Sequence, residues 1–287
     1  MTYGFIGLGN MASAIIRGMV TSGKFDRDTI LGFNRSEGKT LALRDETGLV
    51  PAESARKVAE QADVVIYAGS LVNPALLKNC RADCEIHDSA AMTLEEVLAV
   101  MDRAEAEGKI TVRLHTGDPS IYGAIREQMD ALEARGYAYD VTPGVSSFCG
   151  AAAALKAEYT LPNVSQTVII TRAEGRTPVP EREQLKKLAE HGSTMVLFLS
   201  SSLLEKAQQD LMEGGYAPDT PAAIVYKATW PDEKVFRCTV STMAQTAREN
   251  HVTKTALITV GGFLGNQYDR SLLYDPGFSH GCREASK

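Results

Sequence analysis

The chain contains 287 residues, of which 44% are hydrophobic and 23% are charged, and both values are ordinary for a globular protein. A chain of this length predicts about two domains and can bury a core without disulfides or metals. The formal net charge is −6 and like charges do not cluster, which argues against a nucleic-acid or membrane partner. Because the sequence shows neither a signal peptide nor the ~20 apolar residues of a membrane span, we expect a cytoplasmic protein.

The cysteines do not resemble the framework of a disulfide-rich secreted protein, because their number is odd and their spacing irregular: Cys80, Cys84, Cys149, Cys238 and Cys282. We therefore expect reduced thiols. The spacing of Cys80 and Cys84 predicts that both lie on one face of a helix, with His87 as the nearest imidazole. Metal knuckles usually have a tighter spacing and a second pair, so we predict no metal site.

Strands and helices alternate in the first part of the chain. Apolar runs predict three strands: Tyr3–Gly7, Thr29–Phe33 and Asp63–Tyr67. Helical segments are expected between them: Met11–Thr21, Leu41–Arg44 and Ala55–Gln61. The run Asp63–Tyr67 is continuous, which is typical of a strand covered on both faces. A helix follows at Thr93–Glu107, where Thr93 and Glu96 form a capping-box pattern.

The same alternation continues to the end of the chain. Further strands are predicted at Thr111–Leu114, Tyr139–Val141, Thr167–Thr171, Met195–Leu199, Ala222–Tyr226, Val235–Val240 and Ala256–Val260. Further helices are predicted at Ile121–Leu132, Glu181–Glu190 and Ser202–Met212. Such segments with short loops predict an α/β fold. We expect the joint between domains at Ala154–Asn163, where a helix gives way to a connector that contains a proline.

A glycine motif follows the first strand and opens the first helix. Gly7, Gly9 and Ala12 fit the G-x-G-x-x-G/A fingerprint, which lets a pyrophosphate approach the helix N-terminus. The second strand ends at Arg35 without a carboxylate for a ribose hydroxyl, and this favours NADP over NAD. The alternative is a tight strand-to-helix turn with a packing role.

This N-terminal segment resembles the start of pyrroline-5-carboxylate reductase. The matching stretches are GFIGLGNMASAIIRGMVTSG, the NRS that ends the second strand, and AEQADVVI. The resemblance covers residues 3 to about 66 and then stops, and the helical substrate domain of that family is absent. It implies about half of a dinucleotide-binding domain, without an imine-reducing site.

Two later turns carry residues suited to a ligand. The loop His115–Gly123 (HTGDPSIYG) follows a predicted parallel strand, the position where open α/β sheets bind ligands. In this loop Gly117 permits close backbone approach, and Asp118 can accept hydrogen bonds from a ribose or an amino group. The alternative is a plain helix start with Asp118 as the N-cap and Pro119 at the first helical position. The second turn, PGVSS (143–147), offers the hydroxyls of Ser146 and Ser147.

The chain from Ala62 onward is similar to the tetrapyrrole methylases, and the matching stretches occur in the order of that family: ADVVIYAGSLVNPALL (62–77), IHDSAAMTLEEV (86–97), VRLHTGDPSIYGAI (112–125), YDVTPGVSSFCGAAA (139–153), VIITRAEGRTPVPEREQL (168–185), TMVLFLS (194–200), VYKATWPDEKVFRCT (225–239) and TALITVG (255–261). Within the family, the chain most resembles the enzymes that methylate carbon 11 of precorrin-4 or cobalt-precorrin-4. The resemblance implies an S-adenosylmethionine-dependent C-methyltransferase of cobalamin biosynthesis that forms a homodimer.

The resemblance also implies an architecture and a cofactor site. We expect a two-domain tetrapyrrole methylase preceded by a half-Rossmann β-α-β segment, with divisions at 1–62, 63–158 and 159–287. The implied cofactor contacts are Gly117, Asp118, Ile121, Tyr122, Ser146, Ser147, Leu199, Ala228 and Ala256. From sequence alone, Leu199, Ala228 and Ala256 would all be assigned to the core.

A charged loop and one aromatic residue suggest substrate contacts. Arg172, Glu174 and Arg176 follow a predicted strand, and arginines would anchor the carboxylates of a corrin precursor. The alternative is a solvated loop. Trp230, the only tryptophan, would cover a flat substrate or simply pack. Methyl transfer from a sulfonium needs alignment and exclusion of water, so we name no catalytic acid or base.

The N-terminus departs from the methylase pattern. The family begins with a strand and a Gly-Pro-Gly-Asp-Pro loop beside the substrate, and the reductase-like segment stands in their place here. The run Phe5–Gly9 could fill the position of that strand, but it lacks the aspartate and both prolines. Two alternatives to the methyltransferase therefore remain, an NADP-dependent reductase and an inactive fusion that only binds nucleotide or tetrapyrrole.

Overall fold

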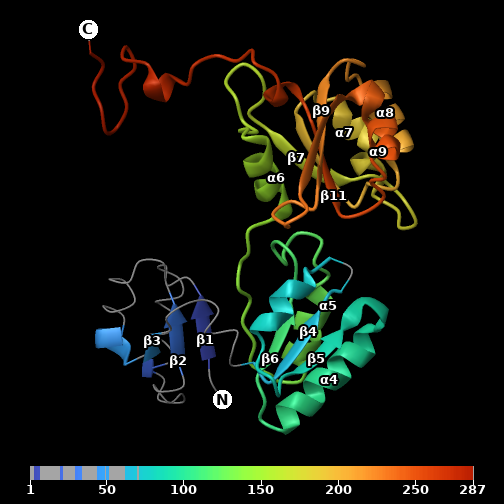
Figure 1. Ribbon diagram of the computed structural model, residues 1–287. Coiled ribbons are helices and arrows are strands. Elements are labelled where there is room, and N and C mark those ends of the chain that lie inside the picture. Colours follow the sequence, from blue (N-terminus) through green and yellow to red (C-terminus); the bar gives the residue numbers. More distant parts are fainter. Residues whose placement is uncertain are drawn as a thin grey trace. The chain divides into compact units, whose positions relative to one another are not determined.

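The computed structural model describes residues 3–6, 20–21, 30–33, 44–48, 50–51, 62–69 and 71–286 (Figure 1). The chain forms two compact units, Met1–Gly144 and Val145–Lys287. The division lies earlier than the expected boundary after residue 158. Helix α6 (Ser147–Leu155) belongs to the second unit, because its residue Leu155 is buried in a core cluster of that unit.

The first unit contains two parallel sheets of three strands each. One has the order β1-β2-β3 and consists of β1 (Tyr3–Ile6), β2 (Ile30–Phe33) and β3 (Val50–Pro51). The other has the order β5-β4-β6 and consists of β4 (Val64–Tyr67), β5 (Glu85–Asp88) and β6 (Thr111–Leu114). The strands expected at the N-terminus are thus confirmed. Because β1 pairs with β2, it does not fill a position in the sheet of β4.

Several expectations for the N-terminal segment lie outside the described residues. They are the helix Ala55–Gln61, the glycine motif with Arg35, and most of the helix Met11–Thr21, of which Val20 and Thr21 are described and helical. The helix expected near Leu41–Arg44 is represented by helical residues 44–47.

The sheet of β4 is built as its sequence predicts. Val64, Val65 and Ile66 are buried in the central strand, which agrees with coverage on both faces. Helix α4 (Leu94–Ala106) begins at the capping box of Thr93 and Glu96, and it buries an apolar stripe: Val97, Leu98, Val100, Met101 and Ala104. This stripe packs with Val64 and Ile66 in one core cluster.

Two expectations after β6 were wrong. Helix α5 spans only Arg126–Ala134, because Tyr122 and Ala124 adopt positive φ angles of 58° and 49° that a right-handed helix does not allow. Residues 139–141 form no strand, and both Tyr139 and Val141 are exposed. A strand needs a paired neighbour, and β6 is hydrogen-bonded to β4 alone in the described sheet.

The two neighbouring cysteines do not share a helix, contrary to expectation. The short 3₁₀ helix η2 (Pro74–Asn79) ends at Cys80, and Cys84 lies in the following loop before β5. Pro74 occupies the start of η2, where proline is tolerated, and the extended backbone of Cys80 ends the helical turn. All five cysteines are free thiols. The remaining 3₁₀ turns of the first unit include η3 (Ser89–Ala91), which follows β5 directly.

The second unit is a five-stranded sheet of order β10-β9-β11-β8-β7 with helices on both faces (Figure 1). Its strands are β7 (Val168–Arg172), β8 (Thr194–Phe198), β9 (Pro221–Tyr226), β10 (Lys234–Thr239) and β11 (Ala256–Val260). Strands β7 and β8 are parallel, and the other neighbours are antiparallel. Its helices are α6, α7 (Leu185–Ala189), α8 (Leu204–Glu213) and α9 (Met243–Glu249).

Alternating side chains divide the core of the second unit between the two faces of the sheet. Met195 and Leu197 of β8 pack with α7, α8 and α9, whereas Val196 packs with α6. This is the period-2 alternation of a strand. The helix expected at Glu181–Glu190 is interrupted, because the extended backbone of Gln184 separates η4 (Glu181–Glu183) from α7.

Short 3₁₀ turns complete the second unit: η5 (Val240–Thr242), η6 (Gly262–Leu264) and η7 (Leu272–Tyr274). In the part of the chain that the structure describes, no helix combines the length and the apolar character that crossing a membrane requires.

Replacing Leu211 with alanine should lower the free energy of unfolding of the second unit by about 2–5 kcal/mol, because this fully buried side chain of α8 would leave a cavity. Urea unfolding followed by the fluorescence of Trp230, the only tryptophan, measures the change in that unit. The control is Lys206→Ala on the exposed side of α8, which should cost less than about 0.5 kcal/mol. Equal losses in both variants would contradict the assigned core.

Candidate functional site

One edge of the five-stranded sheet gathers three of the expected cofactor residues. Strand β11 is antiparallel to both β8 and β9, so the residues after β8 and β9 lie at the same edge as the start of β11. The register that pairs Ile258 with Leu197 continues to place Ala256 opposite Leu199. On the other side, the N–H of Lys227, next to Ala228, donates to the carbonyl oxygen of Thr255 at 2.8 Å. Leu199, Ala228 and Ala256 therefore lie at the same edge of the sheet.

Leu199 has an unusual conformation for a leucine at the end of a strand. Its φ is 49° and its side chain is 57% exposed. A left-handed backbone costs a residue with a Cβ on the order of 1 kcal/mol, and an exposed leucine recovers little of this by burial. The assignment to the core was thus wrong for Leu199, and Ala228 and Ala256 are only partly buried. Strain together with apolar exposure is typical of a ligand site.

The loop after β9 holds Ala228 between two further left-handed residues, Lys227 and Thr229, with φ angles of 48° and 70°. The Lys227 ammonium donates to the Asp232 carboxylate at 2.6 Å and lies 5.0 Å from the centre of the Trp230 ring. The hydrogen bond from Lys227 lowers the pKa of Asp232. Trp230 thus has a partner within its own loop, and both its packing role and its substrate role stay predictions.

Helix α6 brings Ser146 and Ser147 toward the same loop. Ser146 is the buried N-cap residue and Ser147 is the first helical residue. Three residues after Ser147, a Cβ at Gly150 would lie 3.2 Å from the Thr229 methyl carbon and 3.6 Å from the Ala228 Cβ. The first turn of α6 therefore lies against the loop that carries Ala228, and glycine permits this close approach.

The Asp118 carboxylate joins two loops of the first unit. It accepts hydrogen bonds from the N–H of Ser120 and the N–H of Gly144, both at 2.9 Å, and from the Ser120 hydroxyl. These bonds, led by the one from the hydroxyl, lower the pKa of Asp118. The alternative that Asp118 caps the following helix was wrong, because the N-cap of α5 is Ile125.

Glycine is required where these two loops meet. Gly117 has a φ of +63°, and a Cβ added to Gly144 would lie 1.9 Å from the Gly117 carbonyl oxygen. The positive φ of Gly117 and the carbonyl oxygen that faces Gly144 are both features of the backbone. A larger residue at Gly144 would therefore force the two loops apart. Ile121 and Tyr122 follow in the same loop, and Tyr122 is 45% exposed. The expected cofactor residues thus form two groups, one in each compact unit.

The charged loop after β7 is closed by its own side chains. The Arg172 guanidinium donates to the carbonyl oxygens of Thr177 at 3.1 Å and Pro178 at 2.7 Å. The Glu174 carboxylate accepts from the N–H of Val179 at 3.4 Å. Arg172 therefore stabilises the loop, whereas Arg176 is exposed.

The residues expected to bind NADP, Gly7, Gly9, Ala12 and Arg35, lie outside the described part of the chain. Within the described ranges, no group of three or more His, Cys, Asp or Glu side chains is placed to hold a metal ion.

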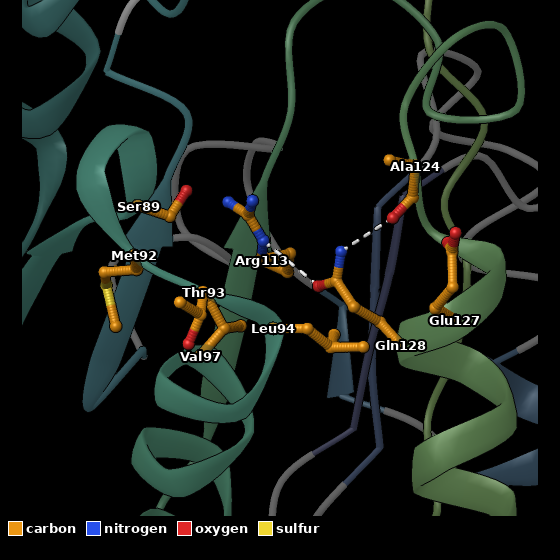
Figure 2. Close-up of a pocket in the computed structure, with 9 residues that line it drawn as sticks. All are labelled: Ser89, Met92, Thr93, Leu94, Val97, Arg113, Ala124, Glu127 and Gln128. Atoms are coloured by element: carbon orange, nitrogen blue, oxygen red, sulfur yellow. Dashed lines mark hydrogen bonds between the residues drawn. The ribbon is translucent and has the colours of Figure 1, made fainter. Parts of the chain in front are cut away.

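A pocket in the first unit was missed by the sequence analysis. It has a volume of about 260 Å³ and lies between the start of α4 and the start of α5 (Figure 2). Arg113 of β6 points into it, beside Ser89 and Gln128 (Figure 2). The only signal in the sequence was a charge within the short strand TVRL, which does not by itself indicate a ligand.

Comparison with known protein families identifies the family of this chain. Residues 52–244 match the family Tetrapyrrole (Corrin/Porphyrin) Methylases, which is more than half of the chain. The chain therefore belongs to the tetrapyrrole methylases. Residues 2–78 match a second family, described as NADP oxidoreductase coenzyme F420-dependent, and this agrees with the reductase-like N-terminal segment.

Individual relatives support the same assignment. A cobalt-precorrin-4 C(11)-methyltransferase of Methanocaldococcus jannaschii is 53% identical over 233 residues, which cover 81% of this chain and 90% of that protein. An S-adenosyl-L-methionine-dependent uroporphyrinogen III methyltransferase of Methanosarcina barkeri is 29% identical over 251 residues, covering 84% and 92%. The X-ray structure of a cobalt precorrin-4 methyltransferase matches with a TM-score of 0.72 at 47% identity, covering 75% of this chain and 90% of that one. The predicted fold class is confirmed.

Replacing Gly144 with alanine should raise the pKa of Asp118 toward its ordinary value, because the added Cβ would push the Gly144 N–H away from the carboxylate. Titration of the Asp118 carboxyl carbon by NMR measures this change. Gly281→Ala is the control, since a Cβ there meets no atom within 4 Å. An unchanged Asp118 pKa in a folded Gly144→Ala variant would show that the two loops are not held as described.

Proposed function

We propose that this protein transfers a methyl group from S-adenosylmethionine to carbon 11 of precorrin-4 or cobalt-precorrin-4 in cobalamin biosynthesis. The family match and the 53% identical relative, which is aligned over 90% of its length, support the reaction and the substrate. The name of the Methanosarcina relative supports the cofactor.

The observation that carries the proposal is the strained edge of the second unit, where Leu199 is exposed and left-handed and Ala228 lies between two left-handed residues. S-adenosylmethionine, when bound, supplies a methyl group on a positively charged sulfur. Leu199 offers an exposed apolar side chain that would cover an apolar part of the ligand and exclude water. Ala228 lies between two left-handed residues, so its backbone groups are held in place for a polar contact.

Asp118 would provide a polar contact to the cofactor. Its hydrogen bonds, led by the one from the Ser120 hydroxyl, lower its pKa and so favour the carboxylate form. A carboxylate has about four acceptor positions, and three donors occupy part of them, which leaves capacity for a ribose hydroxyl or an amino group. Ile121 and Tyr122 of the same loop, and Ser146 and Ser147 at the start of α6, complete the proposed cofactor contacts.

The substrate contacts are proposed for the loop after β7. Exposed Arg176 would bind a carboxylate of the tetrapyrrole, while Arg172 and Glu174 hold the loop in place. We also propose a homodimer. Leu272, Leu273 and Tyr274 are between 58% and 70% exposed, and a second copy would cover such apolar side chains.

A second candidate function is NADP binding by the N-terminal segment, which the match of residues 2–78 to an NADP oxidoreductase family favours. Gly7, Gly9 and Ala12 would form the phosphate turn, and Arg35 would bind the 2′-phosphate. Half a dinucleotide fold does not complete a nicotinamide site, so we propose no reductase reaction.

S-adenosylhomocysteine should bind with a dissociation constant in the low micromolar range, which corresponds to a binding free energy on the order of −8 kcal/mol. Asp118→Ala should weaken this binding by about 1–3 kcal/mol, because donors of the ligand would lose their acceptor. Isothermal titration calorimetry measures both. Asp130→Ala on the exposed side of α5 is the matched control and should bind as the unchanged protein does.

NADPH is the comparison ligand in the same calorimetry. It should bind more weakly than S-adenosylhomocysteine and should not support reduction of pyrroline-5-carboxylate. Tight NADPH binding with turnover, and no heat from S-adenosylhomocysteine, would reverse the order of the two candidate functions.

Methyl transfer to cobalt-precorrin-4 should be slower than that of the Methanocaldococcus relative, on the order of 100-fold, because misplacing reacting atoms by about 1 Å has a cost of this size. The family's Gly-Pro-Gly-Asp-Pro loop is absent, and β1 pairs with β2 in a sheet separate from that of β6, which precedes Asp118. Release of S-adenosylhomocysteine in parallel assays measures both rates.

The control for this prediction is a chimera in which residues 1–61 are replaced by the N-terminal segment of that relative. The chimera should recover most of the rate. Equal rates for the unchanged chain and the relative would show that the absent loop is not needed.

A further inference from the structure

Arg113 is a half-buried cation that forms no ion pair with a carboxylate among the described residues. Its Nη1 donates to the carbonyl oxygen of Ile66 at 3.0 Å, and its Nε donates to the Gln128 side-chain oxygen at 3.2 Å. A guanidinium has five N–H groups, so these two bonds use only part of its donors. Burial lowers the pKa of Arg113, and no neighbouring acid opposes that shift. A cation in this setting is stabilised by an anion that binds beside it.

His115 adds a second unsatisfied group close to Arg113. His115 is the first residue after β6, two positions beyond Arg113, and it is close enough for the charge of Arg113 to act on it. Among the described residues, the buried Nε2 of His115 has no hydrogen-bond partner. Burial lowers the pKa of His115, and the positive charge of Arg113 lowers it further. The end of β6 thus holds a cation and an unpaired imidazole nitrogen.

The pocket of Figure 2 gives an anion access to Arg113. Ser89 follows β5, and Gln128 lies on α5, so the pocket opens where the parallel strands end. A volume of about 260 Å³ exceeds the ~30 Å³ share of one water molecule several-fold and therefore admits a group of several non-hydrogen atoms. The Glu127 carboxylate also lines the pocket, but this residue is exposed and water screens its charge.

We propose that this pocket binds a carboxylate group, with the Arg113 guanidinium as its direct partner and His115 as its neighbour. The identity of the ligand rests on the proposed function, which offers two sources of that group. One is a carboxylate side chain of the tetrapyrrole, and the other is the amino-acid end of the cofactor.

The first experiment tests the site without either ligand of the proposed reaction. Propionate is titrated into the protein against chloride of equal ionic strength, and the imidazole Cε1–H resonance of His115 is followed by NMR, assigned with His115→Gln. The resonance should shift in the unchanged protein and in Arg113→Lys, which retains the charge, but not in Arg113→Gln. Arg126→Gln, an exposed arginine at the start of α5, is the control and should respond as the unchanged protein does. The absence of a propionate-specific shift in the unchanged protein would overturn the proposal.

The second experiment identifies the source of the carboxylate. Calorimetry compares uroporphyrin III, a stable polycarboxylate tetrapyrrole, with S-adenosylhomocysteine. Arg113→Gln should weaken one of them by roughly tenfold or more while Arg113→Lys and Arg126→Gln preserve its affinity. Loss confined to uroporphyrin III assigns the site to the substrate, and loss confined to S-adenosylhomocysteine assigns it to the cofactor.

The remaining outcomes separate this proposal from the proposed function. Unchanged affinities of Arg113→Gln for both ligands overturn the carboxylate site, although the methyltransferase assignment would stand. A propionate response in a protein that binds neither ligand supports the carboxylate site and contradicts the proposed function. Urea unfolding of Arg113→Gln and Arg113→Lys confirms that any loss of binding occurs in folded protein.

Discussion

The position of β11 between β8 and β9 determines where the site of the second unit lies. Because β11 is antiparallel to both neighbours, the end of β8, the end of β9 and the start of β11 meet at one edge of the sheet. Buried side chains on both faces keep β11 in place, with Leu257 packed toward α6 and Ile258 toward α8 and α9. The strained turns at this edge are tolerated because this core holds the strands that carry them.

In the first unit, one carboxylate has the comparable structural role. Asp118 accepts the N–H of Gly144, and the contact between the Gly117 carbonyl oxygen and Gly144 leaves no space for a Cβ. The segment before Gly144 is therefore tied to the end of β6 at one point without being paired to it. Since an unpaired segment gains no sheet hydrogen bonds, residues 139–141 remain exposed although Tyr139 and Val141 are types that favour a strand.

The pairing of β1 with β2 separates the reductase-like segment from the sheet that precedes Asp118. The reductase-like segment brings its own strand partner, so β1 belongs to a sheet other than the one that contains β6. The family match and the cofactor residues lie downstream of β1 and β2. In the sheet of β4, Arg113 of β6 keeps unused donors and lies beside a pocket. A ligand that enters this pocket can therefore be its partner.

The sequence by itself determined the elements whose signals are local. The capping box of Thr93, the apolar run of β4 and the limits of β6 and β11 were predicted correctly, because turn chemistry and periodicity act over a few residues. The family motifs also located the Asp118 loop. Only the tertiary structure decided that Leu199 is exposed and left-handed, that Asp118 bridges to Gly144 and that Arg113 forms no ion pair with any described residue. Those properties depend on partners distant in sequence, and no local pattern of residues encodes which partner is present.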